Sequence, residues 1–304
     1  MPKTNETIVP SPLKRGDHVA IIATARKVSI DILSKAEQIL QSWGLVCLRS
    51  PNLLSEHHQF SGSDDQRRSD LQWAMNDPNV KAIICFRGGY GTVRLLNQLD
   101  PKQLIEQPKW IIGYSDVTAL HLYLNEQNVA SIHGTMPINF LENSSSSLES
   151  LQALLFDSAY EVVAPAHSFN RSGIVRSQAI GGNLAIVQSL MGTPYEIDTK
   201  GKILFLEDVD EYLYNIDRMM WTLKLSGKLD DLAGLIVGGM TDLNDNDKPF
   251  GSSAYESILE KVKDYNYPIC FDFPVGHIHN NNAIPFGINL ELMIDEKGVS
   301  LKKH

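Results

Sequence analysis

The chain of 304 residues is 43% hydrophobic with a formal net charge of −9, the composition of a globular protein long enough for two domains. The acidic balance disfavours a protein that mainly binds nucleic acid or an anionic membrane, because phosphate binding relies on Lys and Arg. The polar first residues lack the apolar core of a secretory signal, and no apolar run approaches the ~18 residues of a membrane span. The three cysteines lie in apolar, strand-like segments typical of reduced thiols. We therefore expect a cytoplasmic protein.

The first half of the chain alternates apolar segments with amphipathic ones. This pattern predicts a mostly parallel sheet covered by helices on both faces. We expect strands at 18–25, 45–50, 82–87, 109–115 and 130–135. We expect helices at 31–43, 64–75, 92–99 and 116–127.

A change of composition follows near residue 160. A serine run at 143–147 and an irregular stretch containing Pro165 are typical of a crossover between domains. The sequence therefore predicts an N-terminal α/β domain over 1–160 and a mixed α/β domain over 161–304. In the second we expect strands at 202–208, 234–240 and 268–273, helices at 213–225 and 252–264, and a hairpin at 290–302.

Ser115 stands where an apolar strand stops and a helix begins. A hydroxyl on such a sharp turn is exposed at the top of a sheet, and the first amides of the helix point toward any group bonded to it. The alternative is that Ser115 only caps the helix. Val117 stands where the G-x-S-x-G turn of α/β-hydrolases has glycine, which argues against that fold.

Two further strand ends carry the partners that a serine nucleophile needs. Glu207 and Asp208 end one apolar strand, and His277 follows another. Because functional groups of parallel sheets emerge at the carboxyl ends of the strands, these side chains are candidates for a base and its orienting carboxylate. The chain order Ser, Glu, His is also that of α/β-hydrolases.

A glycine-rich loop, Arg87-Gly88-Gly89-Tyr90-Gly91, directly follows the strand at 82–87. Its glycines would let backbone amides approach a ligand, so the loop is a candidate for an oxyanion donor opposite the Asp116 amide. Phosphate binding is the competing use, but the loop lacks the Gly-Lys-Ser/Thr ending of a P-loop. Arg87 is a candidate for binding a substrate carboxylate, with Arg94 and Arg218 as weaker ones.

Five motifs together resemble the LD-carboxypeptidase family of serine peptidases, which includes murein tetrapeptide carboxypeptidases and microcin C hydrolases. They are RGGYG at 87–91, GYSD at 113–116, GGNL at 181–184, LED at 206–208 and GH at 276–277. The resemblance covers nearly the whole chain, and the motifs occur in that order.

The resemblance implies an active site at the junction of the two domains. Ser115 would be the nucleophile, His277 the general acid and base, and Glu207 the orienting carboxylate. The amides of Asp116 and of Gly88 or Gly89 would bind the oxyanion. It also implies a cytoplasmic homodimer without metal or cofactor that removes terminal D-Ala from muropeptides by cutting an L-to-D bond.

Three alternatives stay open from the sequence. A microcin-type hydrolase would act on an aminoacyl nucleotide. A metallohydrolase could use the acidic residues 207–211 with His277 and His279, whose spacing puts both histidines on one strand face. A non-catalytic α/β module would use the glycine loop for phosphate and Ser115 as a cap.

Overall fold

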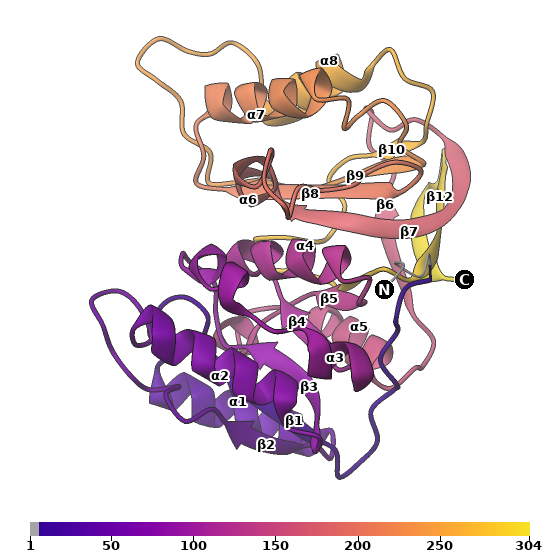
Figure 1. Ribbon diagram of the computed structural model, residues 1–304. Coiled ribbons are helices and arrows are strands. Elements are labelled where there is room, and N and C mark those ends of the chain that lie inside the picture. The colour runs from indigo at the N-terminus through magenta and orange to yellow at the C-terminus, as the bar shows by residue number, and fades with distance from the viewer. Residues whose placement is uncertain (1–5) are drawn as a thin grey trace. The chain divides into compact units, whose positions relative to one another are not determined.

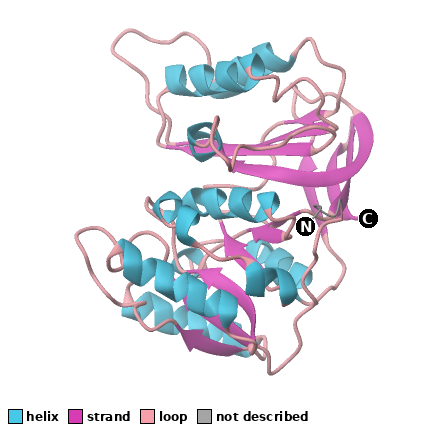
Figure 2. Cartoon of the chain, in the orientation of Figure 1, coloured by secondary structure: helices cyan, strands magenta, loops and turns pink. Residues whose placement is uncertain are grey.

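The computed structural model describes residues 6–304, which form two compact units. The first unit contains the described residues up to Ala159 together with Asn282–Gly287. The second contains Tyr160–Asn281 and Ile288–His304. Figure 1 labels most of the elements, and Figure 2 shows that both helices and strands make up the chain. The predicted α/β class is confirmed.

The first unit is built on a mostly parallel sheet with the strand order β11-β5-β4-β3-β1-β2. Its strands are β1 (His18–Ile22), β2 (Val46–Arg49), β3 (Val80–Cys85), β4 (Trp110–Gly113), β5 (Ser131–His133) and β11 (Ile284–Phe286). Only β11 runs antiparallel to its neighbour, β5. The inner strands β3 and β4 are almost wholly buried, because helices cover both faces of a parallel sheet.

The helices of the first unit are α1 (Ile30–Ser42), α2 (Asp64–Asn76), α3 (Lys102–Glu106), α4 (Thr118–Glu126) and α5 (Ser145–Leu155). Sequence signals fix several of their starts. Ser63 and Gln66 form a capping box at the start of α2. Ser144 accepts the amide of Ser147, so the serine run begins α5, the short helix that precedes the expected domain boundary.

The helix expected at 92–99 is wrong. The segment forms two short 3-10 turns, η1 (Thr92–Arg94) and η2 (Leu96–Gln98). The adjacent Leu95 and Leu96 are both buried, and on an α-helix adjacent residues diverge by about 100°. The tight turns bury both leucines within a very short segment.

The second unit contains a parallel sheet that continues into an antiparallel one. Its strands are β6 (Glu161–Pro165), β7 (Gly173–Asn183), β8 (Ile203–Val209), β9 (Gly234–Thr241), β10 (Ile269–Cys270), β12 (Asn289–Asp295) and β13 (Gly298–Lys303). Strands β7 to β10 are parallel neighbours in chain order. The first part of the long, curved β7 pairs instead with β12 of the hairpin, whose other strand, β13, pairs with β6.

The sequence missed two of these strands. No strand was expected at β7, and β6 lies in the stretch that we expected to be irregular. Helices α6 (Leu184–Ser189), α7 (Leu213–Leu225) and α8 (Ala254–Val262) complete the unit, with α7 packed on α8. In residues 6–304, no helix is long and apolar enough to cross a membrane.

Candidate active site

Ser115 occupies a strained turn between β4 and α4. Tyr114 is still extended, and Ser115, the first residue of the 3-10 turn Ser115–Val117, adopts a φ of 64°. A non-glycine residue in this left-handed region costs about 1–3 kcal/mol, which the surrounding structure must offset. The conformation places the hydroxyl at the carboxyl end of β4, as expected for a nucleophile.

The Ser115 hydroxyl does not cap a helix. Neither the 3-10 turn nor α4 has a side-chain cap, and the hydroxyl forms no hydrogen bond with any described residue. The capping interpretation is therefore wrong for this serine. An unpaired hydroxyl at a strained turn is available for chemistry.

The backbone of Gly88 lies directly against Ser115. A Cβ atom added at Gly88 would lie 2.9 Å from Ser115 Cβ, 3.1 Å from Ser115 Oγ and 3.3 Å from the Asp116 amide nitrogen. Carbon atoms in contact normally keep about 3.5–4.0 Å. Only glycine fits this position, and the glycine loop and the first amide after Ser115 face the same small space.

The Asp116 side chain fastens the glycine loop to the turn. Its Oδ2 accepts the Thr92 amide at 2.9 Å, and Oδ1 accepts no hydrogen bond from any described residue. Burial raises the pKa of Asp116, and the hydrogen bond from Thr92 opposes this shift. The sequence drew attention only to the amide of this residue, whereas its carboxylate sets where the loop ends.

Arg67 anchors the same loop from α2. Its fully buried guanidinium donates to the carbonyls of Thr24 and Gly91 and pairs with Asp64. The Thr92 hydroxyl also donates to Thr24, at 2.8 Å. The loop is therefore tied to the end of β1 as well as to Asp116, a network that no local sequence pattern indicated.

His121 supports the turn from α4. Burial lowers its pKa to about 4, so the ring is neutral near pH 7. The Nε2 atom lies 2.9 Å from the Gly113 carbonyl and must donate, since a carbonyl only accepts; Nδ1 then accepts from the Ser131 hydroxyl at 2.8 Å. The histidine thus joins α4 to the last residue of β4 across the strained turn.

Glu207, which is fully buried, and His277, which is partly exposed, form a hydrogen-bonded pair in the second unit. Glu207 Oε2 accepts His277 Nδ1 at 2.7 Å and the His277 amide at 3.2 Å. Gly276 makes this approach possible: its φ is +111°, and a Cβ there would lie 2.8 Å from Glu207 Oε2. Burial lowers the pKa of His277, but the charge and hydrogen bond of Glu207, together with the charges of Asp208 and Asp242, outweigh burial, and the net shift is upward. This is the arrangement that a carboxylate-oriented base requires.

Asp208 has a different task from its neighbour. Its carboxylate accepts Asn183 Nδ2 at 2.8 Å and the Ala185 amide at 3.0 Å. Asn183 in turn accepts the Ile186 amide and caps α6. Burial, and then the charge of Glu207, raise the pKa of Asp208 to about 7. The Gly-Gly-Asn motif at 181–183 is thus tied to this carboxylate.

The candidate arginines differ in what they contact. Arg94 donates to both carboxylate oxygens of Asp64, and Arg218 donates to Asn215. Arg87 is half-buried and forms no hydrogen bond or ion pair with the described part of the chain. Burial, and then the charge of Arg26, lower its pKa. Arg87 is the candidate whose guanidinium is not already used.

The structure also bears on the metal alternative. Across residues 6–304, no three or more His, Cys, Asp or Glu side chains are grouped so that they could hold a metal ion. The acidic residues that follow Glu207 are used elsewhere: Asp208 binds Asn183, and Asp210 accepts a hydrogen bond from Asn244.

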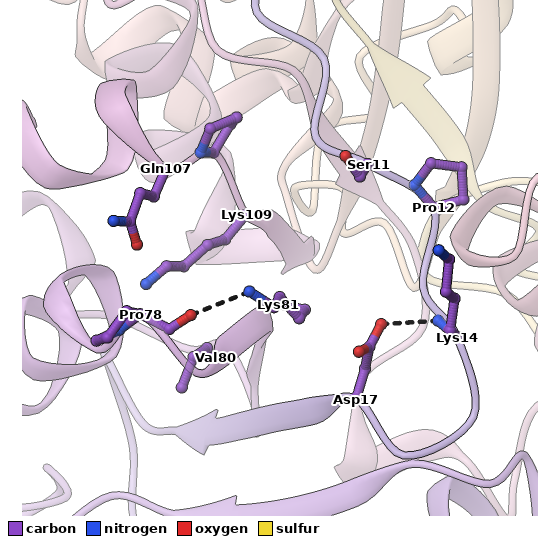
Figure 3. A pocket seen from close by; sticks show the side chains of 10 residues that line it. Ser11, Pro12, Lys14, Asp17, Pro78, Val80, Lys81, Gln107 and Lys109 are labelled. Carbon is purple, nitrogen blue, oxygen red and sulfur yellow. Dashed lines mark hydrogen bonds between the residues drawn. The ribbon is translucent and has the colours of Figure 1, made fainter.

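A cavity of about 360 Å³ lies at the amino ends of β1, β3 and β4, the edge opposite Ser115 (Figure 3). Lys109 lines it and donates from Nζ to the Ala74 and Asp77 carbonyls at the end of α2. Burial lowers the pKa of Lys109 to about 8. A cation at a helix C-terminus stabilises the helix, so Lys109 has a structural role there.

Comparisons with known proteins identify both halves of the chain. Residues 19–134 match the LD-carboxypeptidase N-terminal domain, and residues 176–292 match the LD-carboxypeptidase C-terminal domain. A probable murein peptide carboxypeptidase of Bacillus subtilis (strain 168) is 33% identical over 299 residues, which cover 95% of this chain and 92% of that protein. The murein tetrapeptide carboxypeptidase of Pseudomonas aeruginosa is 28% identical, over 88% of this chain and 91% of that protein.

Solved structures show the same architecture. The muramoyltetrapeptide carboxypeptidase from Oxalobacter formigenes superposes with a TM-score of 0.86 and 27% identity, covering 94% of this chain and 98% of the other. The microcin C7 self-immunity protein MccF, in complex with aspartyl sulfamoyl adenosine, also has a TM-score of 0.86, with 22% identity over 98% of this chain and 99% of the other. The second likeness is one of fold alone.

Proposed function

The chain belongs to the LD-carboxypeptidase family and is a carboxypeptidase, and on that premise we propose that Ser115 is the nucleophile that removes terminal D-Ala from cytoplasmic muropeptide tetrapeptides. The observation that carries the proposal is the geometry at Ser115. A serine with an unpaired hydroxyl is held at a φ of 64°, with the Gly88 backbone packed against it. A helix cap needs neither the strain nor the neighbouring glycine.

In the first step, Ser115 Oγ attacks the carbonyl carbon of the L-to-D peptide bond. The developing oxyanion is bound by the amide of Asp116 and that of Gly88 or Gly89. These donors cost no reorganisation during the reaction, because Asp116, Arg67 and Thr92 already fix the loop. The acyl group remains on Ser115 as an ester.

His277 is the general base in this proposal. It takes the Ser115 proton and then protonates the nitrogen of the departing D-amino acid; a water repeats the sequence to release the acyl group. The carboxylate of Glu207 holds the Nδ1–H, leaving Nε2 to exchange protons, and stabilises the imidazolium. Because the pair and Ser115 belong to different units, the active arrangement requires Nε2 within hydrogen-bond reach of Oγ when substrate is bound.

The terminal carboxylate of the substrate would be bound by Arg87. A guanidinium matches a carboxylate with two parallel hydrogen bonds, and Arg87 has no other ion pair among the described residues. We further expect a cytoplasmic homodimer that needs no metal or cofactor. Activity retained in excess chelator would support serine chemistry over the metal alternative.

The test is release of D-Ala from a purified tetrapeptide muropeptide. Wild-type protein should release it, and Ser115→Ala should not, whereas the control Ser146→Ala, an exposed serine of α5, should retain full activity. Cleavage of an aminoacyl-nucleotide analogue without D-Ala release would favour the microcin-type alternative. Release of D-Ala by Ser115→Ala at the wild-type rate would contradict the nucleophile assignment.

A further inference from the structure

Two arginines, Arg26 and Arg87, lie at the glycine loop, and neither forms an ion pair with a described carboxylate. The charge of Arg26 contributes to lowering the pKa of Arg87, so the two cations are close enough to repel each other. Within residues 6–304, neither side chain forms a hydrogen bond or ion pair, and Arg87 Nε is buried without a partner. Arg87 is half-buried and Arg26 is exposed, so their repulsion is partly screened by water, and an anion bound between the two guanidinium groups would relieve it.

Arg26 reaches this position because residue 89 is a glycine. A Cβ atom at Gly89 would lie 2.6 Å from Arg26 Cδ and 2.7 Å from both Cγ and Nε. The aliphatic stem of Arg26 therefore runs across the bare backbone of Gly89. Gly89 also has a φ of +121°, so both its conformation and the crossing arginine require glycine.

The backbone around both arginines is fixed. On either side of Arg26, the Ala25 carbonyl accepts the Ser61 amide at 3.0 Å and the Lys27 amide donates to Gln59 at 3.2 Å. Before Arg87, the Phe86 amide donates to the Ile22 carbonyl at 2.7 Å. Such anchoring reduces the entropy lost when the guanidinium groups close on a ligand.

The location limits the ligand. Gly88 contacts Ser115, and the two arginines flank Gly88: Arg87 precedes it, and Arg26 crosses the glycine that follows it. The terminal carboxylate of a carboxypeptidase substrate lies one residue beyond the scissile bond, and one residue spans at most ~3.6 Å. An anion site for that carboxylate must therefore lie next to the nucleophile.

We propose that Arg26 is the second arm of a two-arginine clamp, with Arg87, for the free C-terminal carboxylate of the peptide substrate. The inference rests on the proposed function and extends it to the feature that makes the enzyme a carboxypeptidase. Arg26 binds substrate and takes no part in proton transfer. Its loss weakens recognition of the carboxylate and leaves attack by Ser115 intact.

The experiment compares a tetrapeptide with its C-terminal amide on wild type, Arg26→Gln and Arg26→Lys. A hydrogen bond to a charged group contributes about 10- to 100-fold, so kcat/KM of Arg26→Gln for the acid should fall by about that factor, mainly through KM. Cleavage of the amide should stay within about twofold of wild type, because no charged hydrogen bond is lost there. Arg26→Lys should be intermediate, since lysine keeps the charge but not the fork.

Arg94→Gln is the matched control. Arg94 is an exposed arginine of the same loop region, but Asp64 already binds it. The Arg94→Gln variant should keep the wild-type preference for the peptide acid over the peptide amide. Equal losses of acid and amide cleavage in Arg26→Gln, or the same loss of preference in Arg94→Gln, would overturn the clamp.

Binding to Ser115→Ala separates this inference from the proposed function. Calorimetry should show the peptide acid binding more tightly than its amide, and adding Arg26→Gln should abolish the difference. This result supports the clamp even if wild type releases no D-Ala, an outcome that would refute only the proposed function. Adenosine monophosphate is the comparison anion: its binding without that of the peptide acid would overturn the carboxylate assignment in favour of a phosphoryl group.

Discussion

Gly88→Ala adds one methyl group at the most crowded point of the proposed site. The new Cβ would lie 2.9 Å from Ser115 Cβ and 3.1 Å from Oγ. Since carbon atoms in contact keep at least about 3.5 Å, the loop or the serine must move by about 0.6 Å or more. The φ of Gly88 is outside the left-handed region, so alanine adds no backbone strain of its own.

Such a movement separates the nucleophile from the amides that would bind the oxyanion. A displacement near 1 Å costs about 100-fold in rate, and loss of one oxyanion donor costs about 100- to 1,000-fold, or about 2.7–4 kcal/mol. We therefore expect kcat for D-Ala release to fall by at least about 100-fold, with a smaller effect on KM. Steady-state kinetics on the tetrapeptide measures both.

Gly234→Ala is the matched control. Gly234 begins β9 at the amino edge of its sheet, and a Cβ there would lie 3.3 Å from Leu292 Cδ2 and from Val175 Cγ1, so a shift of about 0.2 Å relieves the contact. It should leave kcat unchanged. If Gly88→Ala keeps wild-type kcat while folded, as judged by its melting temperature, the packing of Gly88 against Ser115 has no role in catalysis.

Three further predictions follow from charged groups near the site. Glu207→Gln removes the charge that raises the pKa of His277, so the acid limb of the kcat/KM profile should move to lower pH and kcat should fall by up to about 10⁴-fold. Asp116→Asn weakens the acceptor for the Thr92 amide, so kcat and labelling of Ser115 by a fluorophosphonate should both fall by about 10-fold. The pKa of Asp208 is raised to about 7, so this carboxyl group takes up a proton on folding between its unfolded and folded pKa values. Its contribution to stability is full below about pH 4 and is lost as the pH rises through about 7. Asp208→Asn should therefore show a smaller fall in melting temperature between about pH 5 and pH 8 than the wild type.

Each of these predictions has an outcome that would contradict it. If the acid limb of the pH profile does not move in Glu207→Gln, the Glu207 carboxylate does not raise the pKa of the base that the profile reports. Asp70→Asn is the control for Asp116→Asn: Asp70 is a buried carboxylate of the same unit that accepts the Asn52 amide at 3.0 Å. An equal loss of kcat in both variants would show that Asp116 contributes only to the stability of the fold. Unchanged pH dependence in Asp208→Asn would refute titration of that carboxyl group.

Local patterns predicted the elements that carry the site. The apolar run at 109–115, its break at Ser115 and the helix after it correspond to β4, the turn and α4. Helix α7 was predicted at its observed bounds, Leu213–Leu225, because apolar residues recur there at helical spacing. These signals lie within one segment, so they can be read without the rest of the fold.

The missed features depend on contacts between distant segments. Strand β7 alternates in burial only over its first half, where one face is exposed, and its second half is wholly buried against β8, so no single period marks it. Arg26 lies 63 residues before Gly89, and nothing near Arg26 in sequence indicates that its stem crosses that glycine. The same holds for His121 and Arg67, since Ser131, which His121 contacts, and Thr24, which Arg67 contacts, lie in other segments of the chain.

Covalent labelling of the nucleophile tests the central claim most directly. A fluorophosphonate probe should add once per chain, and peptide mapping should place the adduct on Ser115, with D-Ala release lost in proportion to labelling. The Ser115→Ala protein should take up no probe and release no D-Ala while melting near the wild-type temperature. Full activity in Ser115→Ala, or inactivation by an adduct on another residue, would contradict the account.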